Sequence, residues 1–335
     1  MGGREAPGGG ASVHRGRPPG PSIDRDGDTR RPLAAPGRGW LPAGDRPAEA
    51  AGGAERLTIA IPARGRLREP SASLLADAGF GPEQPGERAL AFPCRNAPVD
   101  VLLVRAADVP EYVQDGVVDC GITGADLVLE RGAKVDELLR LGFGSCTLEA
   151  AVPEEASICT LADLAGLRVA TVYPRLARQL LHEGGLECEL VQVSGAVEVA
   201  PRLGLADAIV DLVSSGNTLR TNGLRSLGAL FASEAVLLGR PGGAAGARRL
   251  AGILRSVVDA RSARYLMLNA PESALEAIAE LVPGSRAPSV IPLAEPGMLA
   301  LHALVPAADV WRLLPRLEAA GASSILIVPV ERMLA

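Results

Sequence analysis

The sequence is poor in aromatic residues and contains a single lysine. Phe, Trp and Tyr make up 3% of its 335 residues, too few for the platforms on which proteins stack single-stranded nucleic acids. A net charge of -5 also argues against a basic nucleic-acid-binding face. Because Lys134 is the only lysine, a Walker-type phosphate loop and Schiff-base chemistry are both disfavoured. Arginine must therefore supply the positive charge of any anion site.

Histidine and cysteine are scarce, and neither is clustered. The three histidines are too far apart in the sequence to indicate a zinc site or a catalytic triad. The five cysteines include no C-x-x-C pair, which is typical of reduced thiols in a cytoplasmic protein. No apolar run reaches the roughly 18 residues that a membrane span requires. We expect a cytoplasmic protein that binds neither nucleic acid nor membrane.

Residues 1–55 are rich in Gly, Pro, Arg and Ala and show almost no apolar periodicity. Such a segment cannot bury enough apolar surface to offset its ordering entropy, so we predict a disordered extension. It lacks the apolar core of a secretory signal. An Arg-rich targeting segment, against which three aspartates count, and a non-native or misassigned extension both remain open.

Short apolar strands alternate with helical patterns from Leu57 onward, as in α/β folds with parallel sheets. An extended stretch at 139–152 predicts a crossover into a second lobe, and a strand at 227–238 predicts the return. We expect residues 56–145 to form lobe I, completed by about 226–245, and residues 146–225 to form lobe II. Lobe II should include a short helix at 197–203.

A glycine-rich linker is expected at 241–246, before a third domain at 248–335. In that domain a helix at 248–265 precedes a βαββαβ order of elements, which predicts a ferredoxin-like module. The module has few residues suited to catalysis, which favours a regulatory or assembly role. A purely structural appendage is the alternative.

One stretch, from Asp207 to Leu224, runs from an apolar strand through Ser-Ser-Gly-Asn-Thr into a predicted helix start. This arrangement directs backbone N–H groups and hydroxyls at one point, where the helix dipole favours negative charge. Gly216 allows a ligand to approach the backbone closely. Asp207 and Asp211 flank the strand and suit ribose hydroxyls or Mg²⁺. A phosphorylated sugar fits the whole set, although the turn alone could be an ordinary capped turn.

Two further polar loops follow strands. The first carries Arg64, Gly65 and Arg66 and suits an anion, although two solvated surface arginines are the alternative. The second, Thr123-Gly124, ends the strand predicted from residue 117. Two lobes with double crossovers would gather these loops around one cleft.

Together these motifs resemble the long-form ATP phosphoribosyltransferases, the first enzymes of histidine biosynthesis. IPARGRL is similar to the family's N-terminal loop, with Arg64 in place of the usual lysine. VDCGITGAD is similar to the family's D-x-G-I-T-G-x-D turn, and GAVEVAPRLGLADAIVDLVSSGNTLRTNGL resembles the family signature. The segment from YLMLNAP to ILIVPV is similar to the family's histidine-binding domain. The likeness runs from about Arg56 to the C-terminus.

The resemblance implies that N1 of ATP displaces pyrophosphate from 5-phosphoribosyl 1-pyrophosphate (PRPP) with Mg²⁺. It implies an α/β core of two lobes like a type II periplasmic binding protein, followed by an ACT-like regulatory domain that binds the inhibitor histidine. Dimers and hexamers are implied as well. The Lys-to-Arg change at Arg64 keeps the positive charge but alters its geometry.

The resemblance also implies roles for residues of this sequence. The 5′-phosphate of PRPP would be held by Ser214, Ser215, Gly216, Asn217, Thr218 and Leu219. The ribose hydroxyls or Mg²⁺ would meet Asp211 first, with Asp207 and Glu198 as further candidates. Pyrophosphate would bind Arg64, Gly65 and Arg66, with Thr123 and Gly124 close to ATP or PRPP. Histidine would bind near Ala287, Ser289 and Ile325.

Two other classes of function remain at this point. A solute-binding protein would share the bilobal fold, but it would need export, and the sequence shows no signal peptide. A nucleotide-binding regulator that has lost catalysis is the second, although the retained turn, acids and arginines count against it.

Overall fold

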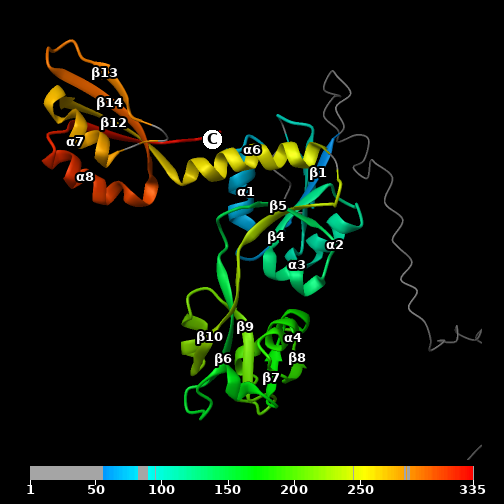
Figure 1. Cartoon of the computed structure of the whole chain (residues 1–335). Coiled ribbons are helices and arrows are strands. Elements are labelled where there is room, and N and C mark those ends of the chain that lie inside the picture. Colours follow the sequence, from blue (N-terminus) through cyan, green and yellow to red (C-terminus); the bar gives the residue numbers. More distant parts are fainter. Residues whose placement is uncertain are drawn as a thin grey trace, which may run out of the picture. The chain divides into compact units, whose positions relative to one another are not determined.

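The computed structural model describes residues 56–81, 90–94, 96–243, 245–282, 284 and 287–334. The extension predicted at residues 1–55 lies outside these ranges. The described residues form three sheets, of six, five and four strands (Figure 1). Among the described helices, none combines the length and the apolar composition that a membrane crossing needs.

The first sheet has the strand order β2-β3-β1-β4-β11-β5. Its strands are β1 (Leu57–Pro62), β2 (Ala91–Pro93), β3 (Val99–Val104), β4 (Cys120–Gly124), β5 (Asp136–Arg140) and β11 (Ala235–Gly239). The central strand β1 runs parallel to β3 and β4, whereas β11 lies antiparallel between β4 and β5. Because both faces of the sheet are covered, the last four residues of β1, Ile59 to Pro62, are all buried instead of alternating between buried and exposed.

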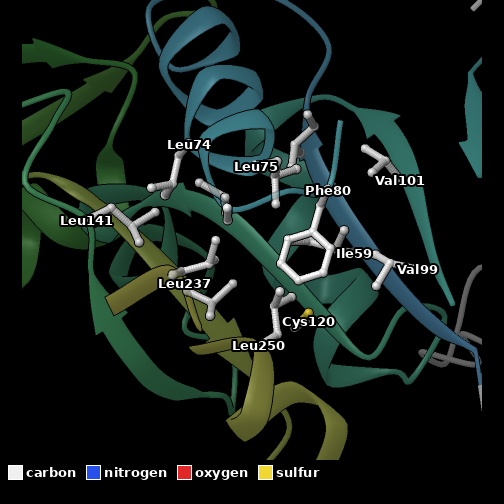
Figure 2. Close-up of a cluster of buried hydrophobic side chains, with 14 of the residues drawn as sticks. Ile59, Leu74, Leu75, Phe80, Val99, Val101, Cys120, Leu141, Leu237 and Leu250 are labelled. Atoms are coloured by element: carbon white, nitrogen blue, oxygen red, sulfur yellow. The ribbon is translucent and has the colours of Figure 1, made fainter. Parts of the chain in front are cut away.

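Helices α1 (Arg68–Asp77) and α6 (Ala245–Arg261) pack on one face of the first sheet, and Figure 2 shows the core between them. Helix α6 buries Leu250, Leu254 and Val257, at the three- and four-residue spacing of a helix stripe. The other face is covered by α2 (Val109–Gln114), which follows a short 3-10 turn, Ala106–Asp108. Residue 248, where we predicted the third domain to begin, therefore lies inside a helix of the first core.

The second sheet has the order β10-β6-β9-β7-β8. Its strands are β6 (Cys146–Pro153), β7 (Arg168–Thr171), β8 (Glu189–Gln192), β9 (Ala208–Val213) and β10 (Leu224–Ser233). Strand β7 is parallel to β8 and β9, and β6 is antiparallel to β9 and β10. Its helical segments are α4 (Pro174–Glu183), α5 (Asn217–Thr221) and the 3-10 turns Leu161–Leu164 and Val197–Val199.

The chain passes between the first two sheets in two neighbouring segments. The first leads from β5 to β6 and the second from β10 to β11; the amide N–H of Leu141 donates to the carbonyl of Ala235 at 3.0 Å. We predicted one strand at 227–238, but the structure breaks it at Glu234 into β10 and β11. The break arises because β10 pairs with β6 in the second sheet, whereas β11 pairs with β4 in the first.

The helix predicted at 197–203 is also shorter than expected. The structure has only the 3-10 turn Val197–Val199, followed by turns. Ala196 before it has φ = 48°, and Gly204 beyond it has φ = 70°, so the backbone is left-handed at both ends. A regular helix cannot continue through either residue.

The third sheet, of order β13-β14-β12-β15, is entirely antiparallel. Its strands are β12 (Ala263–Pro271), β13 (Ser289–Pro292), β14 (Met298–Pro306) and β15 (Ser323–Pro329). Its helices α7 (Leu275–Leu281) and α8 (Val310–Ala319) follow the 3-10 turns Glu272–Ala274 and Ala307–Asp309. This is the predicted ferredoxin-like order. The predicted fold class, a two-lobed α/β core followed by this module, is confirmed.

Candidate functional site

The predicted phosphate-binding turn lies where β9 ends and α5 begins. Ser214 and Ser215 are exposed, and Gly216 precedes the helix with φ = 70°, a left-handed conformation that glycine adopts without strain. No residue in the described part of the chain accepts a hydrogen bond from the backbone N–H groups of residues 215–219. Because α5 has only five residues, these donors and the hydroxyls matter more for anion binding than a helix dipole.

The far side of the turn is anchored by packing and by Arg220. The Leu219 side chain is buried against the second sheet, so only its backbone can face a ligand. Nη2 of Arg220 donates to Oδ1 of Asn217 and, at 3.4 Å, to the carbonyl of Ser215. These contacts hold the turn open toward solvent while its amide groups stay unpaired.

Asp211 lies on β9 directly before this turn. Burial raises the pKa of its carboxyl, an N–H donated by Leu212 at 2.8 Å lowers it, and the charge of Glu198 raises it further. Glu198 therefore lies within electrostatic reach, in the turn that follows Ala196. The structure brings these two acids together.

Asp207 lies at the opposite end of β9. Its carboxylate accepts hydrogen bonds from Nη2 of Arg168 at 2.9 Å and from Nε at 3.2 Å, and a third from the Arg168 backbone N–H at 3.1 Å. These hydrogen bonds lower the pKa of Asp207. The pairing ties β9 to β7, so Asp207 has a structural position and does not join Asp211 at the turn.

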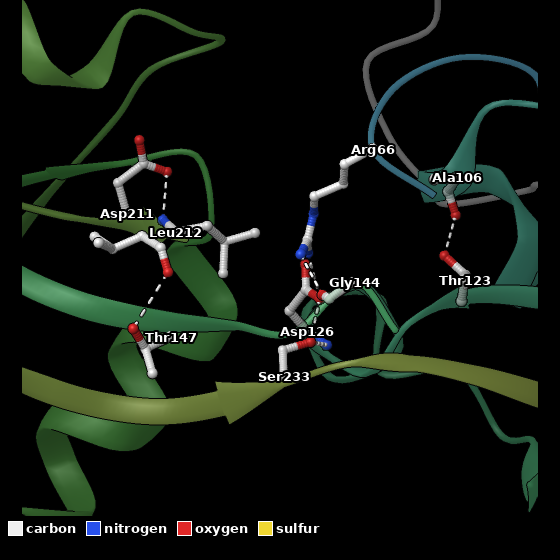
Figure 3. Close-up of polar contacts among 10 residues, drawn as sticks. Arg66, Ala106, Thr123, Asp126, Gly144, Thr147, Asp211, Leu212 and Ser233 are labelled. Carbon is white, nitrogen blue, oxygen red and sulfur yellow. Dashed lines mark hydrogen bonds and ion pairs between the residues drawn. The ribbon is translucent and has the colours of Figure 1, made fainter. Parts of the chain in front are cut away.

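The loop after β1 carries the two predicted arginines. Arg64 is exposed, and no described residue forms a hydrogen bond or an ion pair with its guanidinium. Gly65 has φ = 81°, which turns the chain back toward α1. Arg66 instead donates from Nη1 to the carbonyl of Gly144, and its Nη2 lies 3.8 Å from Oδ1 of Asp126 (Figure 3).

Thr123 and Gly124 end strand β4 and are both buried. The hydroxyl of Thr123 donates to the carbonyl of Ala106 at 2.7 Å, so this side chain points into the protein (Figure 3). Any substrate contact of this turn must therefore come from its backbone. The adjacent Asp126, which we had not predicted as a site residue, is only 1% exposed.

Tyr173 lies directly before α4. Burial raises the pKa of its phenol, and the charges of Asp126 and Asp211 raise it further, whereas that of Arg66 lowers it. The phenol therefore lies within electrostatic reach of the β9 acid and of the Arg66 loop. Sequence reasoning missed Tyr173 because an isolated tyrosine before a helix has no distinguishing pattern.

The predicted histidine-binding residues do not form one cluster. Ser289 begins the edge strand β13, whereas Ile325 lies on β15, the opposite edge of the third sheet. Ile325 packs against the core of that sheet, and Ala287 lies exposed before β13. The described residues contain no group of three or more His, Cys, Asp or Glu arranged to hold a metal ion.

Comparisons with known proteins show which family this chain resembles. The family model of HisG, ATP phosphoribosyltransferase, matches residues 105–257, and that of the HisG C-terminal domain matches residues 260–332. The ATP phosphoribosyltransferase of Methanosarcina barkeri is 41% identical over 287 residues, covering 83% of this chain and 99% of that protein. That of Methanopyrus kandleri is 42% identical over 281 residues, with the same coverage.

A solved structure is also similar. The ATP phosphoribosyl transferase (HisG:HisZ) complex from Thermotoga maritima gives a TM-score of 0.52 at 27% identity, covering 61% of this chain and 98% of that chain. Together with the two family models, which match residues 105–257 and 260–332, these relatives show the family. The chain belongs to the long-form ATP phosphoribosyltransferases and is an enzyme of the histidine-biosynthesis pathway.

Proposed function

We propose that this enzyme transfers the 5-phosphoribosyl group of PRPP to N1 of ATP and releases pyrophosphate. The observation that carries the proposal is the open turn of residues 214–219, whose unpaired amides lie directly after the Asp211 strand. Such a turn binds a phosphate dianion without rearrangement. The family membership supports the same donor and acceptor.

In this proposal the turn binds the 5′-phosphate of PRPP. The amide groups from Ser215 to Leu219, with the hydroxyls of Ser214, Ser215 and Thr218, supply the donors. Charge-assisted hydrogen bonds of this kind are about twice as strong as neutral ones. Gly216 keeps the approach to these amides clear, because no Cβ projects from the centre of the turn.

Asp211, with Glu198 beside it, would hold the ribose hydroxyls and Mg²⁺. Mg²⁺ in phosphate-transfer sites usually takes one or two protein carboxylates and completes its shell with phosphates and water, so this pair fits such an ion. When bound, Mg²⁺ would screen the charge of the pyrophosphate group. Asp207 is excluded from this role in our proposal because Arg168 occupies its carboxylate.

The loop of Arg64, Gly65 and Arg66 would bind the pyrophosphate. Displacement at an anomeric carbon passes through an oxocarbenium-like state that needs little covalent help from the enzyme. Holding both anions and aligning N1 of ATP supplies most of the acceleration. Neither a histidine triad nor a lysine is needed. The backbone of Thr123 and Gly124 would lie beside ATP or PRPP.

The remaining assignments extend the proposal. Residues 146–233, which include β10, would form the phosphoribosyl-binding lobe. The other lobe would consist of residues 56–145 and 234–261, in place of the predicted 226–245, because β11 and α6 belong to the first core. The third sheet would bind histidine as an inhibitor, and the enzyme would assemble as a dimer or hexamer. The location of the histidine site at Ala287, Ser289 and Ile325 and the cytoplasmic location stay predictions.

The test is a pyrophosphate-release assay with ATP, PRPP and Mg²⁺, repeated with and without histidine. We expect release only when both substrates are present. Arg64→Lys should keep most of the activity and Arg64→Ala should lose it, because the position needs a positive charge. Release of pyrophosphate without ATP would contradict the proposed chemistry. Full activity of Arg64→Ala would contradict the proposed pyrophosphate contact.

A further inference from the structure

We propose that Asp126, together with Ser233, is a positioning residue that holds the guanidinium of Arg66 in place for pyrophosphate. The inference rests on the proposed function, because it assigns a task to the loop that we assign to pyrophosphate. It concerns residues brought together from three separate segments: the loop after β1, the start of α3 (Ala125–Arg131) and the end of β10.

The burial of Asp126 requires an explanation. Its side chain is 1% exposed, and a buried carboxylate is costly unless hydrogen bonds and an opposite charge compensate it. The hydroxyl of Ser233 donates to Oδ1 of Asp126 at 2.5 Å and accepts from the Asp126 backbone N–H at 3.0 Å. The compensating charge is Arg66, at 3.8 Å from the same oxygen.

Gly124 makes room for this carboxylate. A Cβ at residue 124 would lie 2.3 Å from Oδ1 of Asp126, so the side chain folds back over the glycine. A larger residue at position 124 would clash with the Asp126 carboxylate, so the buried acid explains this glycine without any ligand.

Gly144 provides the second anchor of the arginine. It has φ = 67°, and a Cβ there would lie 2.3 Å from Cδ2 of Leu67. The loop therefore packs closely on Gly144, whose carbonyl accepts from Nη1 of Arg66. A carbonyl and a carboxylate together fix the orientation of a planar guanidinium.

An arginine held in this way still has donors to offer. A guanidinium has five N–H groups, and the Arg66 side chain keeps 35% of its surface exposed. Arg64, two residues earlier, has no such partners among the described residues. The guanidinium of Arg66 is therefore oriented by its contacts, whereas no described residue orients that of Arg64. Orienting the first in advance reduces the ordering cost of binding a pyrophosphate group.

A double-mutant cycle on the full chain tests the inference. The variants are Asp126→Asn, Arg66→Ala and the combination of both, each measured for kcat and for the KM of PRPP. Asp126→Asn keeps the shape but loses the charge, so we expect the KM of PRPP to rise about 10-fold or more, with a smaller change in kcat. In the Arg66→Ala background the same substitution should have no further effect.

Asp100→Asn is the matched control. Asp100, on β3, pairs with Arg56, directly before β1, through two contacts of 3.1 Å and 2.5 Å, and it has no part in the proposed site. Its loss should leave the KM of PRPP unchanged. Ser233→Ala, which removes the hydroxyl without adding volume, should raise the KM in the same direction as Asp126→Asn and serves as the second variant if Asp126→Asn does not fold.

Binding of inorganic pyrophosphate, measured by calorimetry, gives a readout that needs no turnover. We expect Asp126→Asn to weaken it about 10-fold, and to have no effect when Arg66 is already alanine. Equal losses in both backgrounds, or unchanged affinity in Asp126→Asn and Ser233→Ala, overturn the inference. A wild-type chain that binds pyrophosphate with this dependence but releases none from PRPP and ATP supports the inference and contradicts the proposed function instead.

Discussion

Substituting Gly216 tests the proposed phosphate-binding turn most directly. The residue has φ = 70°, where an L side chain is strained, but the space around it is open: a Cβ would meet only Nη1 of Arg220, at 3.3 Å. That atom is the far end of a flexible side chain and can move aside. Gly216→Ala should therefore fold, with a cost that comes mainly from the backbone conformation.

The magnitude follows from that conformation. A non-glycine residue in the left-handed region costs about 1–2 kcal/mol, which corresponds to a fall of very roughly 2–8 °C in Tm for a domain of this size. If the turn relaxes, its amides no longer point at one phosphate. Each charge-assisted hydrogen bond that is lost contributes about 1.5–3 kcal/mol, so the KM of PRPP should rise at least about 10-fold.

The assay compares Gly216→Ala with Gly223→Ala. Gly223 lies just beyond α5 with φ = 66°, and no atom lies within 4 Å of a Cβ placed there. Both substitutions should lower Tm by similar amounts in thermal melts. Only Gly216→Ala should raise the KM of PRPP in the pyrophosphate-release assay, while the KM of ATP changes little.

The control separates strain from binding. If Gly223→Ala raises the KM of PRPP as much as Gly216→Ala does, the effect comes from general loosening of the lobe. Wild-type kinetics in Gly216→Ala with the expected loss of Tm would remove the turn from the phosphate site. The aspartates beside it would then need another explanation.

Three further predictions concern the acids and the core. Because burial raises the pKa of Asp211, its ionisation lowers the stability of the fold above the folded pKa, and this cost is absent below the ordinary value of 3.8. Asp211→Asn should therefore raise Tm at pH 8 but not near pH 3. The same substitution should lower kcat/KM at least about 10-fold. Because the pKa of Asp207 is lowered, its ionised carboxylate stabilises the fold above pH 3.8, and this stabilisation is lost as the pH falls through the folded pKa. In urea denaturation, Asp207→Asn should be less stable than the wild type at pH 7, and the difference should disappear as the pH falls below 3.8. Asp207→Asn should lower kcat/KM less than Asp211→Asn does. Leu254→Ala in α6 should cost about 2–5 kcal/mol in urea denaturation, because Leu254 is fully buried in the first core; a cost below about 1 kcal/mol would show that α6 is not part of it.

The parts of the fold that the sequence predicts are those with local signals. Strands β1 and β3 and helix α3 are short apolar runs or helical patterns bounded by polar residues, and they follow the alternation predicted from Leu57 onward. The break at Glu234 could not be predicted, because it depends on which strand each half pairs with. The helix predicted at 248–265 lies at 245–261, because the glycine-rich residues obscured its start and its predicted end overlaps β12.

The same distinction applies to the residues of the candidate site: some have a local sequence signal and others do not. The exposed turn at 214–219 follows from its composition, and Asp211 from its position directly before it. Asp207 is also an acid that flanks the strand, but it pairs with Arg168, 39 residues earlier, which only the structure reveals. The contact between Asp126 and Ser233 joins residues 107 positions apart, and no single-sequence pattern encodes it.

The packing of α6 determines where this chain can be shortened. Removing everything from residue 248 would cut inside the helix and strip Leu250, Leu254 and Val257 from the hydrophobic interior around Leu74 and Ile59. A shortened enzyme should instead end after Arg261, where the helix stops and one residue precedes β12. Helix α6, which connects the first core to the third sheet, is thus also part of that core, and it cannot be replaced by a flexible linker.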